Sequence, residues 1–324
     1  MIIENFKGFG GQHCESNATG CLLKNAGLEL SEPMLIGLGQ AFGFIYWKMR
    51  IMNLPFLGGR SKPFALTQTL CTNLGLDLDA RETTSSKKAW SNITDFVDRG
   101  VPIALQLDCY HLEYFSEQMH FAGHFLCVYG YDRDKAYICD TAGMQTTSLQ
   151  SLEKARFEKG PMSAKARSWT ISVRNKRPAL KKIIPEAIKA VAGEFLNPAI
   201  NNFGYAGIRK LGKEIVRWLD LAPHPEKDLA ESAEVMERGG TGGALFRNLY
   251  RDFLKESLEH LPGNRKIEEA GKLYGTAAEL WTEIAILIQQ AGATGGKEHL
   301  KKASALCYKV ADLEKEAMEH LIHL

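Results

Sequence analysis

The chain has 324 residues, a formal net charge of +2, 45 % hydrophobic residues and 24 % charged residues. These values are typical of globular proteins and exclude collagen-like, disordered and coiled-coil classes. The balanced charge gives no indication of general nucleic-acid binding, and no apolar run is long enough to span a membrane. At this length two domains are expected.

The amino terminus and the cysteines favour a cytoplasmic protein. Residues 1–6 have neither the basic nor the apolar region of a secretory signal. The seven cysteines are an odd number, and the first half of the chain, which holds most of them, contains no CxxC pair. We therefore expect free thiols in a reducing compartment.

The first half mixes helical and strand patterns, separated by glycine, proline and asparagine. In chain order they predict helices over 14–25, after Ser31, and over 66–74, 90–99 and 149–157, with strands over 102–107, 121–131, 136–140 and 168–173. Residues 132–135 form a hairpin-like turn. Residues 1–175 are therefore predicted to form an α+β domain.

The second half has helical patterns only. Apolar residues recur at spacings of three and four over 267–291, and similar stripes cover 200–219 and 300–321. Because such stripes need partners, residues 176–324 are predicted to form an antiparallel helical bundle. The expected breaks are at Pro223 and Pro225, Gly239 to Gly243, Pro262-Gly263 and Gly295-Gly296.

Cys14 is the strongest candidate nucleophile. It follows the stretch 10–13, Gly-Gly-Gln-His, and opens a predicted helix, where unpaired N–H groups and the helix dipole favour a thiolate. Backbone N–H groups in this stretch can also hold an oxyanion. A buried structural cysteine is the alternative interpretation. Cys109 is the rival nucleophile, but it follows a strand and lies beside the negative charge of Asp108.

His124 is the candidate base. It lies in a strongly apolar predicted strand, where a histidine needs a polar partner. If the hairpin closes near Tyr131 and Ala136, His124 lies near the end of the next strand, and Asp140 can accept a hydrogen bond from the imidazole. Cysteine, histidine and aspartate are the parts of nucleophilic acyl transfer. A core histidine near a turn aspartate is the alternative.

No metal or cofactor site is expected. His120 and His124 would share a face only on a helix, whereas the surrounding pattern is that of a strand. The glycines at 37, 39 and 43 do not have the spacing of a dinucleotide-binding motif, and no Walker sequence occurs.

The chain resembles papain-like cysteine enzymes, including the bacteriocin-processing peptidases, and more closely the BtrH-like family of butirosin biosynthesis. The resemblance covers nearly the whole chain. It rests on His13-Cys14-Glu15, Leu30 to Glu32, Gly37 to Tyr46, Asp108-Cys109-Tyr110, Phe121 to Asp132, and a helical region with Asn201 to Ile208 that ends in Trp218.

The resemblance implies a papain-like domain followed by an all-α domain. It implies a cysteine acyltransferase of antibiotic biosynthesis that moves an acyl group from a carrier-protein thioester, or another acyl thioester, to a small-molecule amine. The catalytic residues would be Cys14, His124 and Asp140, with Gln12 and Asp108 near the substrate or oxyanion. Gln12 departs from the peptidases because it stands only two residues before Cys14, so backbone N–H groups can serve instead.

Two alternatives remain open at this stage. A cysteine peptidase or amide hydrolase would use the same residues with water as the acceptor, and an interaction module would leave them idle. The sequence does not fix the oligomeric state, and a homo-oligomer is one option. A basic segment predicts a surface for an acidic carrier protein, and a solvated linker beside a helix is the alternative interpretation. The segment comprises Arg174, Lys176, Arg177, Lys181 and Lys182.

Overall fold

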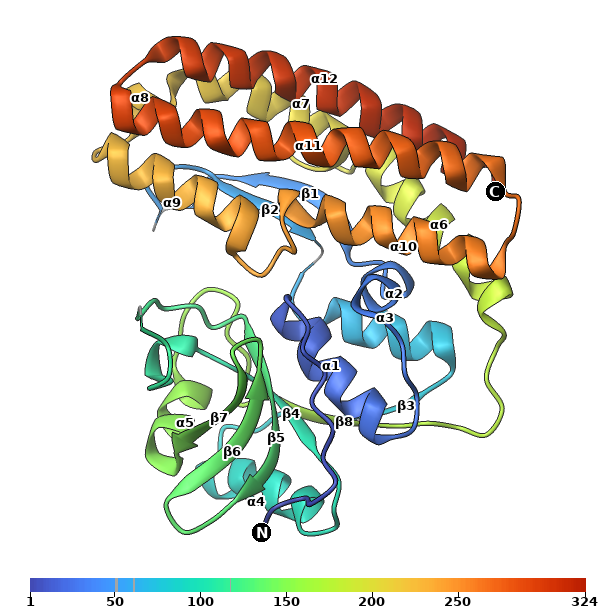
Figure 1. Cartoon of the computed structure of the whole chain (residues 1–324). Helices are drawn as coiled ribbons and strands as arrows, with labels where there is room; N and C mark the ends of the chain where they lie inside the picture. Colours follow the sequence, from blue (N-terminus) through green and yellow to red (C-terminus); the bar gives the residue numbers. More distant parts are fainter. Residues whose placement is uncertain (50–51, 61, 117) are drawn as a thin grey trace. The chain divides into compact units, whose positions relative to one another are not determined.

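The structure is a computed structural model that describes residues 1–49, 52–60, 62–116 and 118–324 (Figure 1). The chain forms two compact units. The first comprises Met1–Leu35 and Pro63–Pro178, and the second comprises Ile36–Lys62 and Ala179–Leu324. The predicted sheet-containing first part and helical second part are confirmed.

The first unit is built on a six-stranded antiparallel sheet with the strand order β3-β8-β4-β5-β6-β7. The strands are β3 (Asp77–Arg81), β4 (Ile103–Leu107), β5 (His124–Tyr131), β6 (Lys135–Asp140), β7 (Gly143–Ser148) and β8 (Ser168–Ser172). The helices are α1 (Cys14–Asn25), α3 (Ala65–Leu74), α4 (Ser86–Val97), the short η1 (Cys109–His111) and α5 (Leu149–Phe157). Helix α2 (Glu32–Leu38) begins in this unit and ends in the second.

Helices cover both faces of this sheet. Figure 1 shows α1 on one side and α5 on the other. Successive side chains of a strand point to opposite faces, and in β5 Leu126 and Val128 belong to the core cluster with α4 and α5. Cys127 faces the other way and lies near Cys21 of α1. The sheet is therefore buried between two helical layers.

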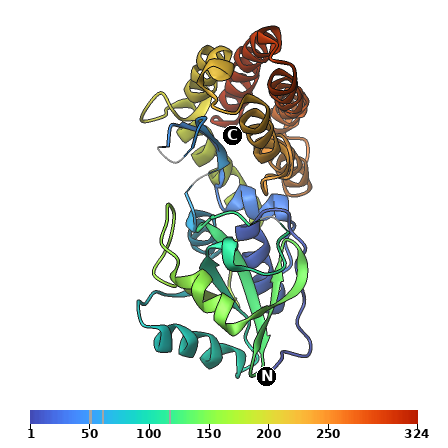
Figure 2. The same cartoon turned by 90° about the vertical axis from the view of Figure 1, so that its left-hand side faces the viewer.

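The second unit contains a small sheet and a bundle of helices. Strands β1 (Phe42–Trp47) and β2 (Phe56–Arg60) pair antiparallel. The helices are α6 (Leu180–Leu196), α7 (Gly204–Glu214), η2 (Ile215–Arg217), α8 (Trp218–Leu221), α9 (Pro225–Arg238), η3 (Ala244–Phe246), α10 (Arg247–His260), α11 (Arg265–Thr294) and α12 (Lys297–Leu321). Figures 1 and 2 both show α11 and α12 as adjacent long helices.

The predicted breaks between the later helices are confirmed, because each falls between two observed helices or, for Pro225, at the first residue of one. The apolar stripe over 267–291 is buried along α11. The stripe over 200–219 is divided among α7, η2 and α8, and Ile200 lies before it with 44 % of its surface exposed. Its contribution to that stripe was therefore predicted wrongly.

The segment 36–62 differs from the prediction of one domain over residues 1–175. This segment belongs to the helical unit. Phe42 of β1 stacks on Tyr250 of α10 with ring centroids 4.1 Å apart. Gly37 is packed against the ring of Phe253, so that a Cβ atom there would clash. These long-range aromatic contacts leave no periodic signal in the sequence.

Within the described residues, no helix has both the length and the apolar character needed to cross a membrane.

Candidate functional site

Cys14 is the first residue of helix α1, as predicted. His13 precedes the helix with an extended backbone, and its Nδ1 accepts a hydrogen bond from the Ser16 N–H at 3.3 Å. This N-cap satisfies one of the N–H groups that have no partner inside the helix. The Cys14 side chain is buried, with 9 % exposure for the residue.

Two side chains fasten the stretch 10–13 before the nucleophile candidate. Asn17 Oδ1 accepts hydrogen bonds from the N–H groups of residues 10 and 11, at 3.1 and 2.8 Å. Glu32 accepts hydrogen bonds from the N–H groups of residues 12 and 13, at 2.9 and 2.8 Å. All four N–H groups are engaged, so this stretch does not supply the free oxyanion donors that the sequence suggested.

A further donor at this helix end is the Cys14 N–H itself. The first N–H groups of a helix have no intrahelical acceptor, and no acceptor for this one is found within the described part of the chain. Gln12 is exposed, and its backbone N–H donates a hydrogen bond to Glu32. Backbone geometry therefore favours the Cys14 N–H over Gln12 as an oxyanion donor.

Glu15 is a second buried carboxylate near Cys14, and the sequence did not indicate its structural role. Its oxygens accept hydrogen bonds from the N–H groups of Phe64 at 2.9 Å and Thr67 at 3.1 Å. Thr67 lies in the first turn of α3, where an anion is favoured by the helix dipole. The amino-terminal ends of α1 and α3 are thereby tied together.

His124 and Asp140 form a direct pair. His124 Nε2 and Asp140 Oδ2 are 2.7 Å apart, and the residues are 6 % and 0 % exposed. The hairpin closes with Tyr131 opposite Ala136, the closure from which this contact was expected. A bulge shifts the register by one residue between Val128 and Gly130.

The charge of each partner stabilises the other. Burial alone would lower the pKa of His124, but the Asp140 charge and hydrogen bond, with a contribution from Cys14, raise the pKa well above its usual value. Burial alone would raise the pKa of Asp140, but the His124 charge and hydrogen bonds from His124, Tyr114 and Thr141 hold this pKa below its usual value. The pair therefore favours an imidazolium beside a carboxylate.

Cys14 completes the contact with the imidazole. The side chains of Cys14 and His124 lie within interaction range of each other. Because Nε2 is used by Asp140, Nδ1 is the ring atom available to the thiol. Cys14, His124 and Asp140 thus converge in one buried cluster of the first unit, with a thiol, an imidazole and a carboxylate in sequence.

Tyr114 and Thr141 hold the carboxylate from other sides. The Tyr114 hydroxyl donates a hydrogen bond to Asp140 Oδ2, and the Thr141 N–H donates to Oδ1 at 2.6 Å. Sequence reasoning did not find Tyr114. It lies in an irregular segment between η1 and β5, where no periodicity marks its partner.

Cys109 lies near the same cluster, within electrostatic reach of both Cys14 and His124. Burial raises the pKa of its thiol, and the Sγ donates to the Met119 carbonyl at 3.3 Å. It has no helix N-terminus behind it, since η1 is a single 3₁₀ turn. Cys14 is therefore better suited to be a nucleophile.

Asp108 has a structural explanation. Its Oδ1 accepts hydrogen bonds from the N–H groups of Tyr110 at 2.9 Å and Phe121 at 3.2 Å, and the residue is buried. These contacts fix both ends of the irregular segment after β4. They do not support the substrate or oxyanion role that the sequence suggested for Asp108.

The histidines near the site have other partners. His111 Nε2 lies 2.7 Å from Glu158 Oε2, and the His120 ring stacks on Tyr110 at 4.0 Å. Among the described residues, no group of three or more His, Cys, Asp or Glu side chains is arranged to hold a metal ion.

The fold and the site together define a class of protein. It has an antiparallel α+β unit that holds a cluster of cysteine, histidine and aspartate, and a helical part follows that unit in the chain. Residues 13–141 match the family described as Butirosin biosynthesis protein H, N-terminal. Residues 150–321 match the family described as Domain of unknown function (DUF4872). The second match covers more than half of the chain.

The chain belongs to this family of BtrH-like proteins with an accompanying carboxy-terminal domain. The resemblance inferred from the sequence is therefore confirmed, and it relates the chain to a biosynthetic family. No curated protein matches the chain.

Proposed function

We propose that the protein is a cytoplasmic, papain-like cysteine acyltransferase that moves an acyl group from a carrier-protein thioester to a small-molecule amine. The observation that carries the proposal is the buried chain of contacts from Cys14 through His124 to Asp140. A nucleophile on a helix end, facing an imidazole oriented by a carboxylate, is the arrangement of covalent acyl transfer. All seven cysteines are free thiols, in accord with a reducing compartment.

In the first half-reaction, the Cys14 thiolate attacks the carbonyl carbon of the acyl thioester. A carbon–sulfur bond forms, and the carbonyl electrons move to the oxygen, where the Cys14 N–H donates a hydrogen bond. The tetrahedral intermediate then expels the donor thiolate, which takes the proton of the His124 imidazolium. The products are acyl-Cys14, a neutral imidazole and the free donor thiol.

In the second half-reaction, the amine attacks the carbonyl carbon of acyl-Cys14. His124 Nδ1 takes the proton that the attacking nitrogen loses, and the Cys14 thiolate leaves. The products are an amide and the original thiolate and imidazolium pair. Asp140 remains ionised throughout and holds the imidazole in place through Nε2.

Family membership supports acyl transfer over hydrolysis. Butirosin biosynthesis protein H, after which the matching family is named, belongs to a biosynthetic process. Exchange between two thioesters needs little driving force, which suits a cysteine nucleophile. The final step from thioester to amide is downhill.

The test is intact mass spectrometry of the full chain with an acyl thioester of N-acetylcysteamine. We expect an acyl adduct that Cys14→Ser abolishes and Cys109→Ser retains. The adduct should persist in buffer and discharge when a primary amine is added. Rapid discharge to water would instead indicate a hydrolase. No adduct on a folded chain would indicate an idle module.

A further inference from the structure

Tyr114 touches the catalytic cluster through one oxygen atom. Its hydroxyl donates to Asp140 Oδ2, the same atom that lies 2.7 Å from His124 Nε2. The other oxygen, Oδ1, accepts from the Thr141 N–H at 2.6 Å. Asp140 is fully buried, so water does not share this carboxylate. The charge on Oδ2 is therefore divided between Tyr114 and His124.

The segment that carries Tyr114 is fastened at the preceding residue. Glu113 accepts hydrogen bonds from the hydroxyls of Thr147 at 2.5 Å and Ser148 at 2.7 Å. Burial would raise the pKa of Glu113, but hydrogen bonds from Thr147, Ser151 and Ser148 lower it to about 2. Glu113 therefore stays ionised at neutral pH and ties the segment to the end of β7.

The following residue packs on the imidazole. The ring of Phe115 meets that of His124 edge to face, with centroids 5.5 Å apart. Three successive residues thus contact the end of β7, the carboxylate and the imidazole. Tyr114 is held in place by neighbours on both sides, which makes its hydrogen bond to Asp140 a fixed part of the site.

Tyr114 acts as a neutral donor. Burial and the charge of Asp140 raise the pKa of its hydroxyl far above the usual value, so the proton stays on the phenol. A neutral hydroxyl that donates to a carboxylate stabilises its negative charge and weakens its attraction for a second donor.

We propose that Tyr114 is a positioning residue that acts on His124 through Asp140. It fixes Oδ2 and takes up part of its negative charge, so that the imidazolium gives its proton more readily to the leaving thiolate. This role rests on the proposed acyl transfer and adds a fourth side chain to its machinery. Among the titratable groups that the structure describes, Asp140 from β6 and Cys14 from α1 face His124, Cys109 from η1 acts at longer range, and Tyr114 contacts Asp140.

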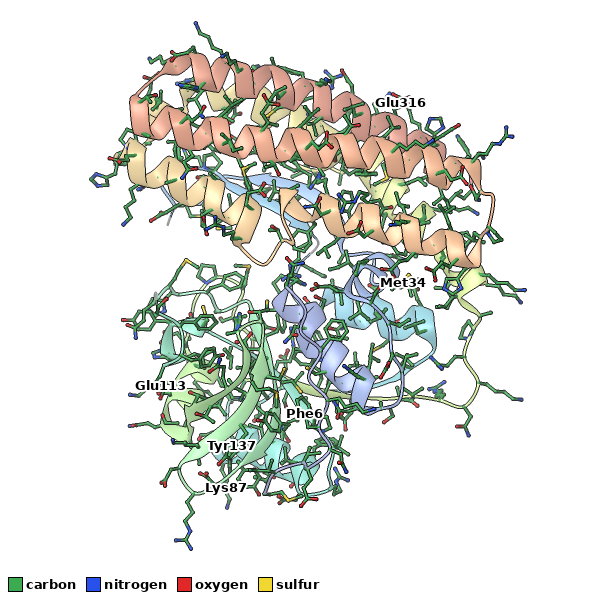
Figure 3. All side chains as sticks on the ribbon, viewed as in Figure 1. Phe6, Met34, Lys87, Glu113, Tyr137 and Glu316 are labelled. Carbon is green, nitrogen blue, oxygen red and sulfur yellow. The ribbon has the colours of Figure 1, made fainter. Side chains whose placement is uncertain are left out.

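The test compares Tyr114→Phe with Tyr137→Phe. Tyr137 also donates to an aspartate, Asp132, at 2.8 Å, but it lies on the same hairpin beside the β5–β6 turn. Figure 3 labels both Tyr137 and Glu113, the neighbour of Tyr114. Both changes remove one tyrosine-to-aspartate hydrogen bond, so the control reports any general effect of that loss.

The readout is the NMR titration of the His124 ring, assigned with His124→Gln. Tyr114→Phe should raise the titration midpoint by about 0.5 to 1 pH unit, because Asp140 then acts on the imidazole alone. With the N-acetylcysteamine thioester, kcat should fall about tenfold at little change in KM. Tyr137→Phe should change neither the midpoint nor kcat.

An unmoved or lowered midpoint in folded Tyr114→Phe overturns the positioning role, even if activity falls. If Tyr114→Phe does not fold, 3-fluorotyrosine incorporated throughout the chain replaces it, since a more acidic phenol should lower the midpoint. No shift there also overturns the role. The titration needs no acyl donor. An absent acyl-Cys14 in the wild type would therefore refute the proposed function separately.

Discussion

The part of the chain that the structure describes contains two buried ion pairs, one in each compact unit, and the pairs differ in how many of their polar atoms are already hydrogen-bonded. In the second unit, Arg247 and Glu314 are both 0 % exposed and form two hydrogen bonds, at 2.8 and 2.7 Å. Arg247 also donates to the carbonyls of Gly43 and Leu245, and Trp281 donates to Glu314. Nearly every polar atom of this pair is used inside the protein.

The His124 and Asp140 pair of the first unit differs, because one of its polar atoms is not used by the pair itself. One ring nitrogen faces the carboxylate, and the other is available to the Cys14 thiol. We call the Arg247 and Glu314 pair the closed pair and the His124 and Asp140 pair the open pair. A closed pair stabilises the fold, whereas an open pair has a ring nitrogen left for acid–base chemistry. Burial alone would not have distinguished the two.

The largest expected effect comes from removing the imidazole. His124→Ala should lower the rate of acyl transfer from the N-acetylcysteamine thioester about a thousandfold, because the thiol loses its base and the leaving group its acid. Stopped-flow detection of released thiol measures this rate. His260→Ala, an exposed histidine of α10, is the control and should keep the wild-type rate. A His124→Ala rate near wild type would contradict the mechanism.

Breaking the closed pair should affect stability and not chemistry. Glu314→Gln leaves the buried Arg247 charge without its counterion, which typically costs about 3 to 5 kcal/mol. Urea unfolding followed by tryptophan fluorescence measures the loss. Glu316→Gln, on the same helix and exposed (Figure 3), should stay within about 0.5 kcal/mol of wild type. Folded Glu314→Gln should still alkylate at Cys14 normally, and a slower alkylation would refute the contrast.

Removing the Asp140 carboxylate of the open pair should change the pH dependence of acyl transfer. In Asp140→Asn, burial dominates at His124 and its pKa should fall below about 6.5. The alkaline limb of the acyl-transfer profile should then move to lower pH, with a rate loss on the order of a hundredfold, smaller than for His124→Ala. Asp132→Asn at the hairpin turn is the control and should leave the limb unchanged.

The same change has a predictable sign for stability. A raised histidine pKa stabilises the fold at pH below the unfolded value, and that contribution is lost as pH rises through the folded pKa. A lowered aspartate pKa stabilises the fold above the unfolded value near about 4. The free energy of unfolding of the wild type should therefore exceed that of Asp140→Asn most at pH values between the unfolded pKa of aspartate and the unfolded pKa of histidine. Urea unfolding at a series of pH values measures this difference. A difference that grows above the folded pKa of His124 would contradict this account.

The smallest expected effect concerns the carrier. Reversal of Lys181 and Lys182 to glutamate should weaken use of a carrier-bound thioester a fewfold at low salt, because rim charges act mainly on association. A free N-acetylcysteamine thioester should be used as before. Lys301 and Lys302 of α12, reversed together, are the matched control. Equal effects on both donors would show that this segment does not bind the carrier.

Some of the site was predictable because it depends on local pattern. The glycine-rich stretch before Cys14 and the apolar spacing after it predicted α1, whose observed bounds agree. The turn between the two apolar strands predicted the hairpin that brings Asp140 near His124. In both cases neighbouring residues in the sequence determine the geometry.

The rest depends on contacts between distant segments. Glu32 reaches the stretch before Cys14, and Tyr114 reaches Asp140, without any repeating pattern that marks the pair. Strands β3 and β7 were missed because they are polar strands at the two edges of the sheet, without apolar alternation. Polar partners and edge strands become visible only when the fold is complete.

The bulge in β5 determines on which face the base lies. The extra residue, Tyr129, shifts the pairing so that Val128 meets Ile138, which puts His124 and Asp140 on the same face of the hairpin. Without that residue the pairing register would shift by one, and His124 and Asp140 would lie on opposite faces of the hairpin. Deletion of Tyr129 would thus separate the imidazole from the carboxylate and leave the hairpin paired.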